Sequence, residues 1–274
     1  MHDNHLMKTM IEVAIEAAKD AGASILLAAN NLSVLHVEQK SPNDFVSDVD
    51  RNAEKIISRH IKHSFPEHNI LGEEYGSQGD EFSEYMWVVD PLDGTTNFLR
   101  SIAHYAVSIA VLKNGEVEHA VVFDPCKNEL FTASRGKGAF MNGQRLNVSN
   151  ASSIEGGLLS TGIPFGAEGL TTIDMFTCSM TALLGKKTSG IRRLGAAALD
   201  LAYVAAGRYD GFWEAGLKKW DIAAGVLLVA EAGGFVTDFK GECDYLNSGN
   251  VVAATKSVHL DMLPVVKGCY HRIF

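Results

Sequence analysis

The chain has few of the residues that mark several large classes of protein. Its 274 residues include four cysteines, Cys126, Cys178, Cys243 and Cys269, and no C-x-x-C pair. Cysteines scattered in this way argue against a thiolate metal site and against a disulfide framework. The sequence also has no run of about 20 uncharged apolar residues, so we expect neither a membrane span nor a membrane partner.

Positive charge is also scarce. The 24 Lys and Arg residues face 33 Asp and Glu residues, which gives a net charge of −9. A broad contact with a nucleic-acid backbone needs clustered positive charge, so nucleic acid is not expected as the main ligand. A small anionic substrate stays possible, because bound cations reverse the sign of a site. The N-terminus has neither the basic segment nor the apolar core of a signal peptide, and we expect a cytoplasmic protein.

The first half of the chain predicts helices followed by an antiparallel sheet. Apolar residues recur at helical spacing over about 7–28, and a second helix begins with Asp48 as its cap. Two apolar runs, 106–112 and 117–123, then flank Asn114-Gly115, which is a strong signal for a β-hairpin. Further short strands are expected to about residue 146.

The second half alternates helices with short strands. Helices are expected over about 194–207 and 221–233 and near 257–268, with strands near Phe212, 235–236 and 251–253. The stretch 149–153 is the best boundary between the halves. We therefore predict one α/β (α+β) domain over 1–274, a layered sandwich with halves of about 1–150 and 151–274.

Acidic residues stand at the ends of apolar runs in both halves. They are Glu73 and Glu74 after Ile70-Leu71-Gly72, Asp90 and Asp93 after Trp87-Val88-Val89, Asp221 after Trp220, and Asp50 early in the second helix. Burying like charges together is costly unless a cation pairs with them. Oxygen ligands of this kind suit Mg²⁺ or Mn²⁺, and no His/Cys cluster offers a zinc site instead.

The turn after Asp93 has the chemistry of an anion site. Gly94 lets the backbone approach a ligand closely. If a helix begins there, the N–H groups of Gly94 and Thr95 can donate to phosphate oxygens, and the Thr95 hydroxyl can orient a water molecule. Carboxylate-held cations beside such a turn indicate phosphoryl transfer to water.

These motifs resemble those of a known family. In chain order they are the stretch 43–46, Glu73-Glu74, the run DPLDGTTNF at 90–98, the run WDIAAG at 220–225 and the stretch 231–234. Together they resemble the inositol monophosphatase family of magnesium-dependent, lithium-sensitive phosphatases over nearly the whole chain. The run ALDLAYVAAGR at 198–208 is similar to bacterial members.

The resemblance implies the metal ligands. Glu73, Asp90 and the backbone carbonyl of Leu92 would hold a first Mg²⁺. Asp90, Asp93 and Asp221 would hold a second, and Glu73 would also touch a weaker third site. Two or three Mg²⁺ ions per site are therefore expected.

The resemblance also implies the other site residues. Asp50 and Thr95 would orient the attacking water, with the carboxylate of Glu74 nearby. The positions implied for substrate binding are Leu92, Asp93, Gly94 and Thr95 around the phosphate, Arg192, Gly195, Ala196 and Ala197 along the cyclitol, and Glu214 at the substrate hydroxyls. The implied fold is an αβαβα layered sandwich, and the implied assembly is a homodimer.

Three positions near the motifs carry weaker signals. Many relatives have Ser or Thr where Ala196 stands, so one substrate hydroxyl loses a partner here. Lys40 stays unassigned, because its local spacing varies in the family. His104 is expected to be a packed or surface histidine rather than a site residue.

We therefore interpret the chain as a magnesium-dependent phosphomonoesterase that hydrolyses inositol monophosphate, or another small polyol or sugar phosphate, by a metal-activated water. Fructose bisphosphate and a nucleotide 3′-phosphate are alternative substrates, although the run 95–98 favours the inositol branch. Two further alternatives are a regulatory binding role in an RNA or protein complex and a purely structural use of the metals.

Overall fold

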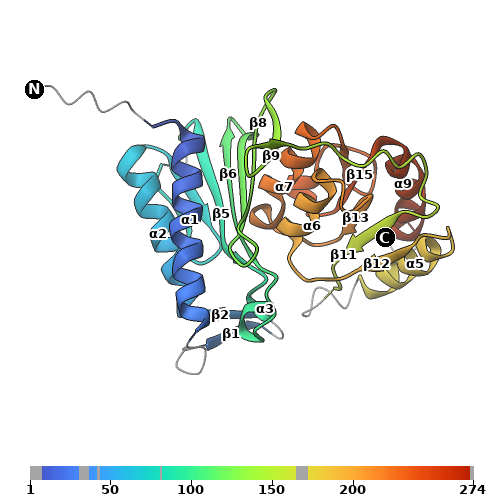
Figure 1. Cartoon of the computed structure of the whole chain (residues 1–274), viewed down its shortest axis with the longest axis horizontal. Coiled ribbons are helices and arrows are strands. Elements are labelled where there is room, and N and C mark those ends of the chain that lie inside the picture. The colour runs from blue at the N-terminus through green and yellow to red at the C-terminus, as the bar shows by residue number, and fades with distance from the viewer. Residues whose placement is uncertain (1–7, 31–36, 42–43, 81, 165–171, 272–274) are drawn as a thin grey trace, which may run out of the picture.

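The computed structural model describes residues 8–30, 37–41, 44–80, 82–164 and 172–271. Within them, helices and sheets stack in five layers along the long axis of the molecule (Figure 1). The order is helices α1 and α2, an eight-stranded sheet, helices α6 and α7, a five-stranded sheet, and helices α5 and α9. The predicted αβαβα sandwich is confirmed.

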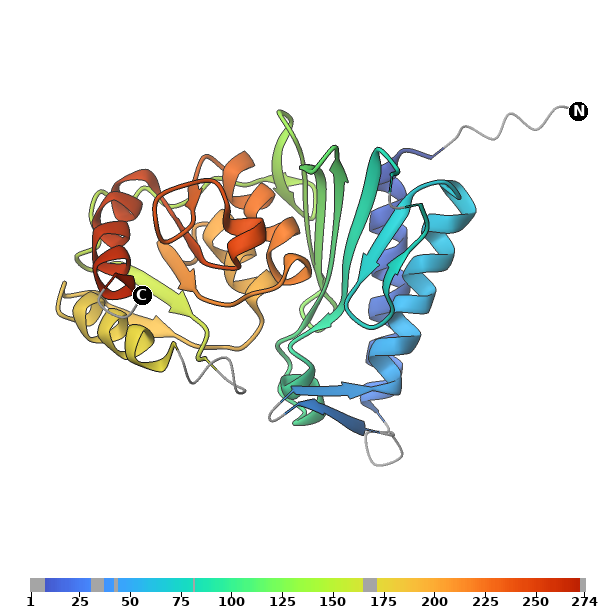
Figure 2. The same cartoon turned by 180° about the vertical axis from the view of Figure 1, so that it is seen from behind.

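The first helical layer packs on the outer face of the large sheet. It consists of α1 (Met10–Ala29) and α2 (Asp48–Ser64), which are joined through the hairpin of β1 (Val37–Ser41) and β2 (Asp44–Ser47). Both helices bury one face against Trp87, Val89 and other side chains of the sheet. In Figure 2, where the molecule is seen from behind, the same two helices cover this face of the sheet.

The large sheet has the order β10-β9-β8-β7-β6-β5-β3-β4. In chain order its strands are β3 (Asn69–Gly72), β4 (Gly76–Gln78), β5 (Tyr85–Asp93), β6 (Ala106–Lys113), β7 (Glu116–Asp124), β8 (Glu129–Ser134), β9 (Gly138–Met141) and β10 (Gln144–Arg145). The predicted hairpin is confirmed as β6 and β7. All neighbours are antiparallel except β3 and β5, which run parallel and so end at the same edge. The short helix α3 (Thr95–Leu99) follows β5 directly.

The small sheet has the order β12-β11-β13-β15-β14. Its strands are β11 (Leu158–Thr161), β12 (Gly190–Arg192), β13 (Gly211–Glu214), β14 (Phe235–Thr237) and β15 (Val251–Ala254). The helices of this half are α5 (Ile173–Leu184), α6 (Ala197–Ala205), α7 (Lys219–Glu231), α8 (Tyr245–Ser248) and α9 (Lys256–Tyr270). The predicted helices at 194–207, 221–233 and 257–268 correspond to α6, α7 and α9.

The central helices α6 and α7 join the halves through one continuous core. Residues 222–229 of α7 are all buried, as expected for a helix between two sheets. Val88 and Val122 of the large sheet and Phe212 and Val251 of the small sheet belong to the same apolar cluster. The two sheets therefore hold the middle layer from both sides, and they bring the ends of β5 and β13 toward one region.

Two expectations from the sequence are wrong in detail. Asp48 does not cap α2: Ser47 is the N-cap, and its hydroxyl accepts a hydrogen bond from the Val49 N–H at 3.2 Å. The cysteines are not all unpaired either, because Cys178 of α5 and Cys269 of α9 form a disulfide across a Cα–Cα distance of 5.8 Å. Their separation of 91 residues gave no local spacing signal. None of the described helices is both long and apolar enough to span a bilayer.

Candidate active site

The centre of the site is the irregular end of β5. Asp90 pairs with Ser108 and Asp93 with Ala106, so β5 has one residue more than β6 between these pairs. An extra residue of this kind re-aims the side chains next to it. Asp90 is 2% exposed, and its Oδ1 accepts the Leu92 N–H at 3.0 Å. The Oδ2 of Asp93 accepts the Ala198 N–H at 2.7 Å, which ties this turn to α6.

A glycine makes the next turn possible. Gly94 has a φ of +94°, in the left-handed region that favours glycine. A Cβ at this position would lie 3.1 Å from the His104 carbonyl oxygen and 3.3 Å from that of Gly195. The helix α3 begins at the following residue, Thr95, so the turn is directly followed by a helix. The turn is therefore enclosed by backbone from both halves of the molecule.

Thr95 links this turn to the first layer. Its Oγ1 lies 2.9 Å from Oδ1 of Asp50 and 3.0 Å from the Leu92 carbonyl oxygen, and it can donate its proton to either. Asp50 is 2% exposed, and its Oδ2 accepts the Ser47 N–H at 2.9 Å. Burial raises the pKa of Asp50. The start of α2 thus places a buried carboxyl group against the Thr95 hydroxyl.

The Glu73–Glu74 turn follows β3, beside the end of β5. The Glu73 N–H donates to the Val89 carbonyl oxygen at 3.1 Å, one residue before Asp90. The Glu74 N–H donates to Oε2 of Glu54 on α2 at 2.8 Å. The parallel pairing of β3 with β5 therefore brings Glu73 to the same sheet edge as Asp90.

The second half contributes Glu214 and Asp221. Asp221 is the third residue of α7, and its Oδ2 accepts the Lys218 N–H at 2.7 Å. Glu214 ends β13 and lies against Gly162, where a Cβ would be 1.7 Å from its Oε1. Beside Glu214 is a small cavity of about 10 Å³, lined also by Met175, Phe176 and Trp213.

Burial and neighbouring carboxylates raise the pKa of Asp90, Asp93 and Glu214. Burial raises the pKa of Asp90 well above its usual range, and the charges of Glu73, Asp93 and Asp221 raise it further. Burial likewise raises the pKa of Asp93, with the charges of Asp221, Glu214 and Glu73 adding to it. Burial and the charge of Asp221 raise the pKa of Glu214 to about 8, while Arg193 and the Gly162 N–H act in the opposite direction. The five groups thus share one strongly negative region.

The donor chemistry fits divalent cations. No three His, Cys, Asp or Glu side chains within the described parts of the chain already surround a single metal position. These carboxyl groups are nevertheless close enough for their negative charges to raise the pKa of their neighbours. A bound cation would lower those pKa values again. Oxygen ligands without sulfur or imidazole are those that Mg²⁺ prefers.

The residues expected along the substrate ring lie on two elements. Arg192 ends β12 and is exposed. Gly195 has a φ of +85°, Ala196 is the buried N-cap of α6, and Ala197 begins that helix. The charge of Arg192 lowers the pKa of Tyr209, whereas the charge of the neighbouring Arg193 lowers that of Glu214. The side chain of Lys40 lies outside the part that the structure describes, as does Asn43 of the first family motif.

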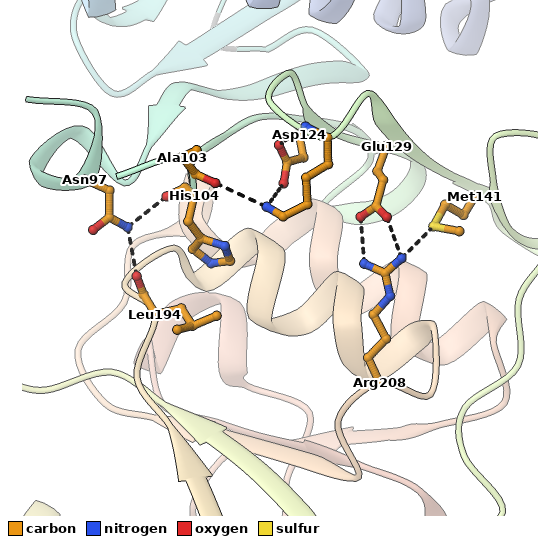
Figure 3. Close-up of polar contacts among 9 residues, drawn as sticks. Asn97, Ala103, His104, Asp124, Glu129, Met141, Leu194 and Arg208 are labelled. Atoms are coloured by element: carbon orange, nitrogen blue, oxygen red, sulfur yellow. Dashed lines mark hydrogen bonds and ion pairs between the residues drawn. The ribbon is translucent and has the colours of Figure 1, made fainter. Parts of the chain in front are cut away.

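Hydrogen bonds join the two halves at Asn97 and at Arg208 (Figure 3). The Asn97 Nδ2 donates to the carbonyl oxygens of His104 and Leu194, at 2.8 Å each. His104 is 6% exposed, and burial lowers its pKa to about 4, so it is the packed histidine that was expected. A second contact between the halves follows α6, where Arg208 donates two hydrogen bonds of 2.6 Å to Glu129 of β8.

No site role was predicted from the sequence for Gly162, Glu54 or Asp200. Asp200 on α6 is 1% exposed, and burial with the charges of Glu214 and Asp93 raises its pKa well above the usual range. Asp200 lies in the run 198–208, which resembles bacterial members, but that resemblance implied no site role for it. Glu54 had a usable signal, because it is one helical turn after Asp50 and so on the same face of α2.

Comparisons with known proteins identify the family of the chain. The model of the inositol monophosphatase family matches residues 6–267. The Nus factor SuhB of Pseudomonas aeruginosa is 48% identical over 263 residues, which cover 95% of this chain and 97% of the relative. The solved structure of extragenic suppressor protein suhB from Bartonella henselae is 42% identical with a TM-score of 0.91, covering 95% of this chain and 99% of that one. An IMPase from Thermotoga maritima is 36% identical with a TM-score of 0.85, covering 96% and 98%. The chain therefore belongs to the inositol monophosphatase family.

Proposed function

We propose that the protein is a magnesium-dependent phosphomonoesterase that hydrolyses inositol monophosphate to inositol and phosphate. The observation that carries this proposal is the gathering of carboxylates from β5, the end of β3 and the start of α7 beside the Gly94–Thr95 turn, where the charges of Glu73 and Asp221 act on Asp90 and Asp93. Such a group needs cations, and the turn offers N–H donors to a phosphate. Membership of a family that generally depends on metals supports the same reading.

The proposed ligands follow the arrangement of the carboxylates. Glu73, Asp90 and the Leu92 carbonyl would hold one Mg²⁺, and Asp90, Asp93 and Asp221 a second, with Glu73 also beside a weaker third ion. When bound, the ions would supply the positive charge that polarises the phosphate oxygens and stabilises the leaving alkoxide.

Asp50 and Thr95 would orient the attacking water. When the Thr95 hydroxyl donates to Asp50, its oxygen lone pairs are free to accept a hydrogen bond from water. Because burial raises the pKa of Asp50, this carboxylate is a better proton acceptor than an exposed aspartate. Glu74 would add a second carboxylate near the same water.

The substrate would lie between the two halves. Its phosphate would receive hydrogen bonds at residues 92–95, and its hydroxyls would bond to Glu214 along the wall of Arg192 and residues 195–197. Ala196 offers no hydroxyl to the substrate, which widens the expected range to other polyol and sugar phosphates, fructose bisphosphate included.

Phosphate release from a panel of phosphomonoesters tests the proposal. We expect the highest kcat/KM for inositol 1-phosphate, activity that disappears in a chelator, and recovery with Mg²⁺ more than with Ca²⁺, since the larger ion tolerates looser geometry. Asp93→Asn should lower kcat more than it raises KM. Full activity in the chelator would contradict the proposal.

A second function has support in the names of the relatives. We propose that the chain also has a binding role in an RNA or protein complex, because its relative in Pseudomonas aeruginosa is named a Nus factor. Replacing that relative by this chain in its host tests the role. Equal growth with the wild-type chain and with Asp93→Asn would show a role independent of hydrolysis. Loss of growth with Asp93→Asn alone would tie the role to catalysis.

We further propose a homodimer. Sedimentation equilibrium should give twice the monomer mass at micromolar concentration, and a monomer mass at that concentration would contradict this assembly.

A further inference from the structure

Glu54 is a buried carboxylate one helical turn away from Asp50. Residues four apart on a helix lie on the same face, so α2 directs both side chains toward the large sheet. Glu54 is 0% exposed. Burying a carboxylate in this way costs free energy unless its oxygens accept hydrogen bonds. The groups that donate to Glu54 therefore identify the segment that it stabilises.

Glu54 accepts hydrogen bonds from the turn that carries Glu73 and Glu74 and from β4, which follows that turn. Its Oε2 accepts the Glu74 N–H at 2.8 Å, and its Oε1 accepts the Tyr75 N–H at 3.2 Å and the Gln78 Nε2 at 3.4 Å. A Cβ on Gly72 would lie 2.0 Å from Oε1. The backbone from Gly72 to Tyr75 thus wraps around this one carboxylate, and glycine at position 72 leaves it the space.

These contacts fix the backbone of Glu73 from two sides. Its own N–H donates to the Val89 carbonyl oxygen at 3.1 Å, and the next N–H in the chain is held by Glu54. Val89 directly precedes Asp90. The direction of the Glu73 side chain relative to Asp90 therefore depends on both the sheet and Glu54.

We infer that Glu54 is a positioning residue that holds the Glu73–Glu74 turn ready for metal, and so sets the affinity of the site formed by Glu73 and Asp90. The inference rests on the proposed function, in which these two carboxylates are metal ligands. Residues that orient ligands without touching the ion typically change metal affinity about 10- to 100-fold when replaced.

The variant Glu54→Gln tests this role. The amide keeps the size of the side chain but offers one oxygen, and its NH₂ group faces an N–H donor of the turn. Asp238→Asn is the matched control, because Asp238 is 3% exposed and its Oδ1 accepts the N–H groups of Lys240 and Glu242 at 2.8 Å each, in a turn after β14. Mn²⁺ binding measured by electron paramagnetic resonance gives a readout separate from activity.

We expect Glu54→Gln to raise the Kd for Mn²⁺ about tenfold and the Mg²⁺ concentration for half-maximal phosphate release by a similar factor, with kcat largely restored at saturating Mg²⁺. Asp238→Asn should lower the Tm but keep the Kd within about twofold of wild type. An unchanged Kd in a folded Glu54→Gln protein, or an equal rise in both variants, would overturn the inference.

A measurement on the wild-type chain decides the matter if Glu54→Gln does not fold. In metal-free protein, the amides of Glu74 and Tyr75 should exchange with deuterium far more slowly than free amides, because Glu54 holds them before metal arrives. Unprotected exchange would overturn the inference. Wild-type protein that binds Mn²⁺ but releases no phosphate would refute the phosphatase proposal while leaving the Glu54 test intact. Wild-type protein that binds no Mn²⁺ would refute both.

Discussion

Replacing Gly162 by alanine should separate recognition of the substrate hydroxyls from chemistry at the phosphate. The new Cβ would lie 1.7 Å from Oε1 of Glu214, whereas ordinary contact begins at 3.4 Å. The carboxylate must therefore retreat by 3.4 − 1.7 = 1.7 Å. A hydrogen bond of about 2.8 Å would stretch to about 4.5 Å, beyond any useful interaction.

With cations bound at the site, Glu214 would be ionised in the assay, and the expected loss follows from that charge. A hydrogen bond to a charged group contributes about 1.5–3 kcal/mol, which corresponds to about 10- to 150-fold in kcat/KM. We expect this loss for inositol 1-phosphate. For p-nitrophenyl phosphate, which has no ring hydroxyls, kcat/KM should change little, because the carboxylates at the phosphate lie on other elements.

Steady-state phosphate release on both substrates is the assay. Gly268→Ala is the control, since a Cβ there meets nothing within 4 Å, and Glu214→Gln should reproduce the selectivity of Gly162→Ala. Equal losses on both substrates, or no loss on either, would refute the assignment of Glu214 to the substrate hydroxyls.

The remaining predictions concern pH, lithium and the contact between the halves. In a chelator, the free energy of unfolding should fall as pH rises from 6.5 to about 8. Over this range folded Glu214, whose pKa is raised from 4.5 to about 8, keeps a proton that the unfolded chain has lost. Urea titrations in which stability rises over this range would contradict the prediction. Lithium should inhibit uncompetitively, and inhibition should deepen as the substrate concentration rises. A small monovalent ion in the proposed site of Asp90, Asp93 and Asp221 would stabilise the leaving alkoxide less than Mg²⁺ does. An effect of lithium on KM alone would argue against Asp221 as a ligand. Arg208→Lys should lower stability by about 1 kcal/mol or less, because a single ammonium replaces the two hydrogen bonds to a partly exposed Glu129; a thermal melt as stable as wild type would show that the pair contributes nothing.

Long periodic segments and dense motifs were predictable from the sequence. The helices α1, α6, α7 and α9 and the hairpin of β6 and β7 follow from hydrophobic period and from Asn114-Gly115, signals that depend on neighbouring residues alone. Asp90 and Asp93 stood out because two carboxylates directly follow an apolar strand. Their roles as ligands stay predictions.

Features fixed by distant contacts were missed. The strands β11 (Leu158–Thr161) and β12 (Gly190–Arg192) are too short to show a periodic pattern, and α5 lies between them in the chain. The disulfide between Cys178 and Cys269 joins residues 91 apart, a distance at which spacing carries no information. Glu54 lies one helical turn after Asp50, but its hydrogen bonds to the N–H groups of Glu74 and Tyr75 join residues 20 and 21 positions apart, and no local pattern shows them. Each case depends on the tertiary structure rather than on local sequence.

The central claim is that the carboxylates of both halves hold divalent cations beside a phosphate site. Anomalous diffraction from crystals grown with Mn²⁺ and phosphate tests this claim most directly. The account predicts at least two Mn²⁺ peaks about 2.0–2.4 Å from carboxylate oxygens of Glu73, Asp90, Asp93 and Asp221, with phosphate against the Gly94 and Thr95 N–H groups. Crystals with no Mn²⁺ peak among these four side chains, or with phosphate bound elsewhere, would contradict it.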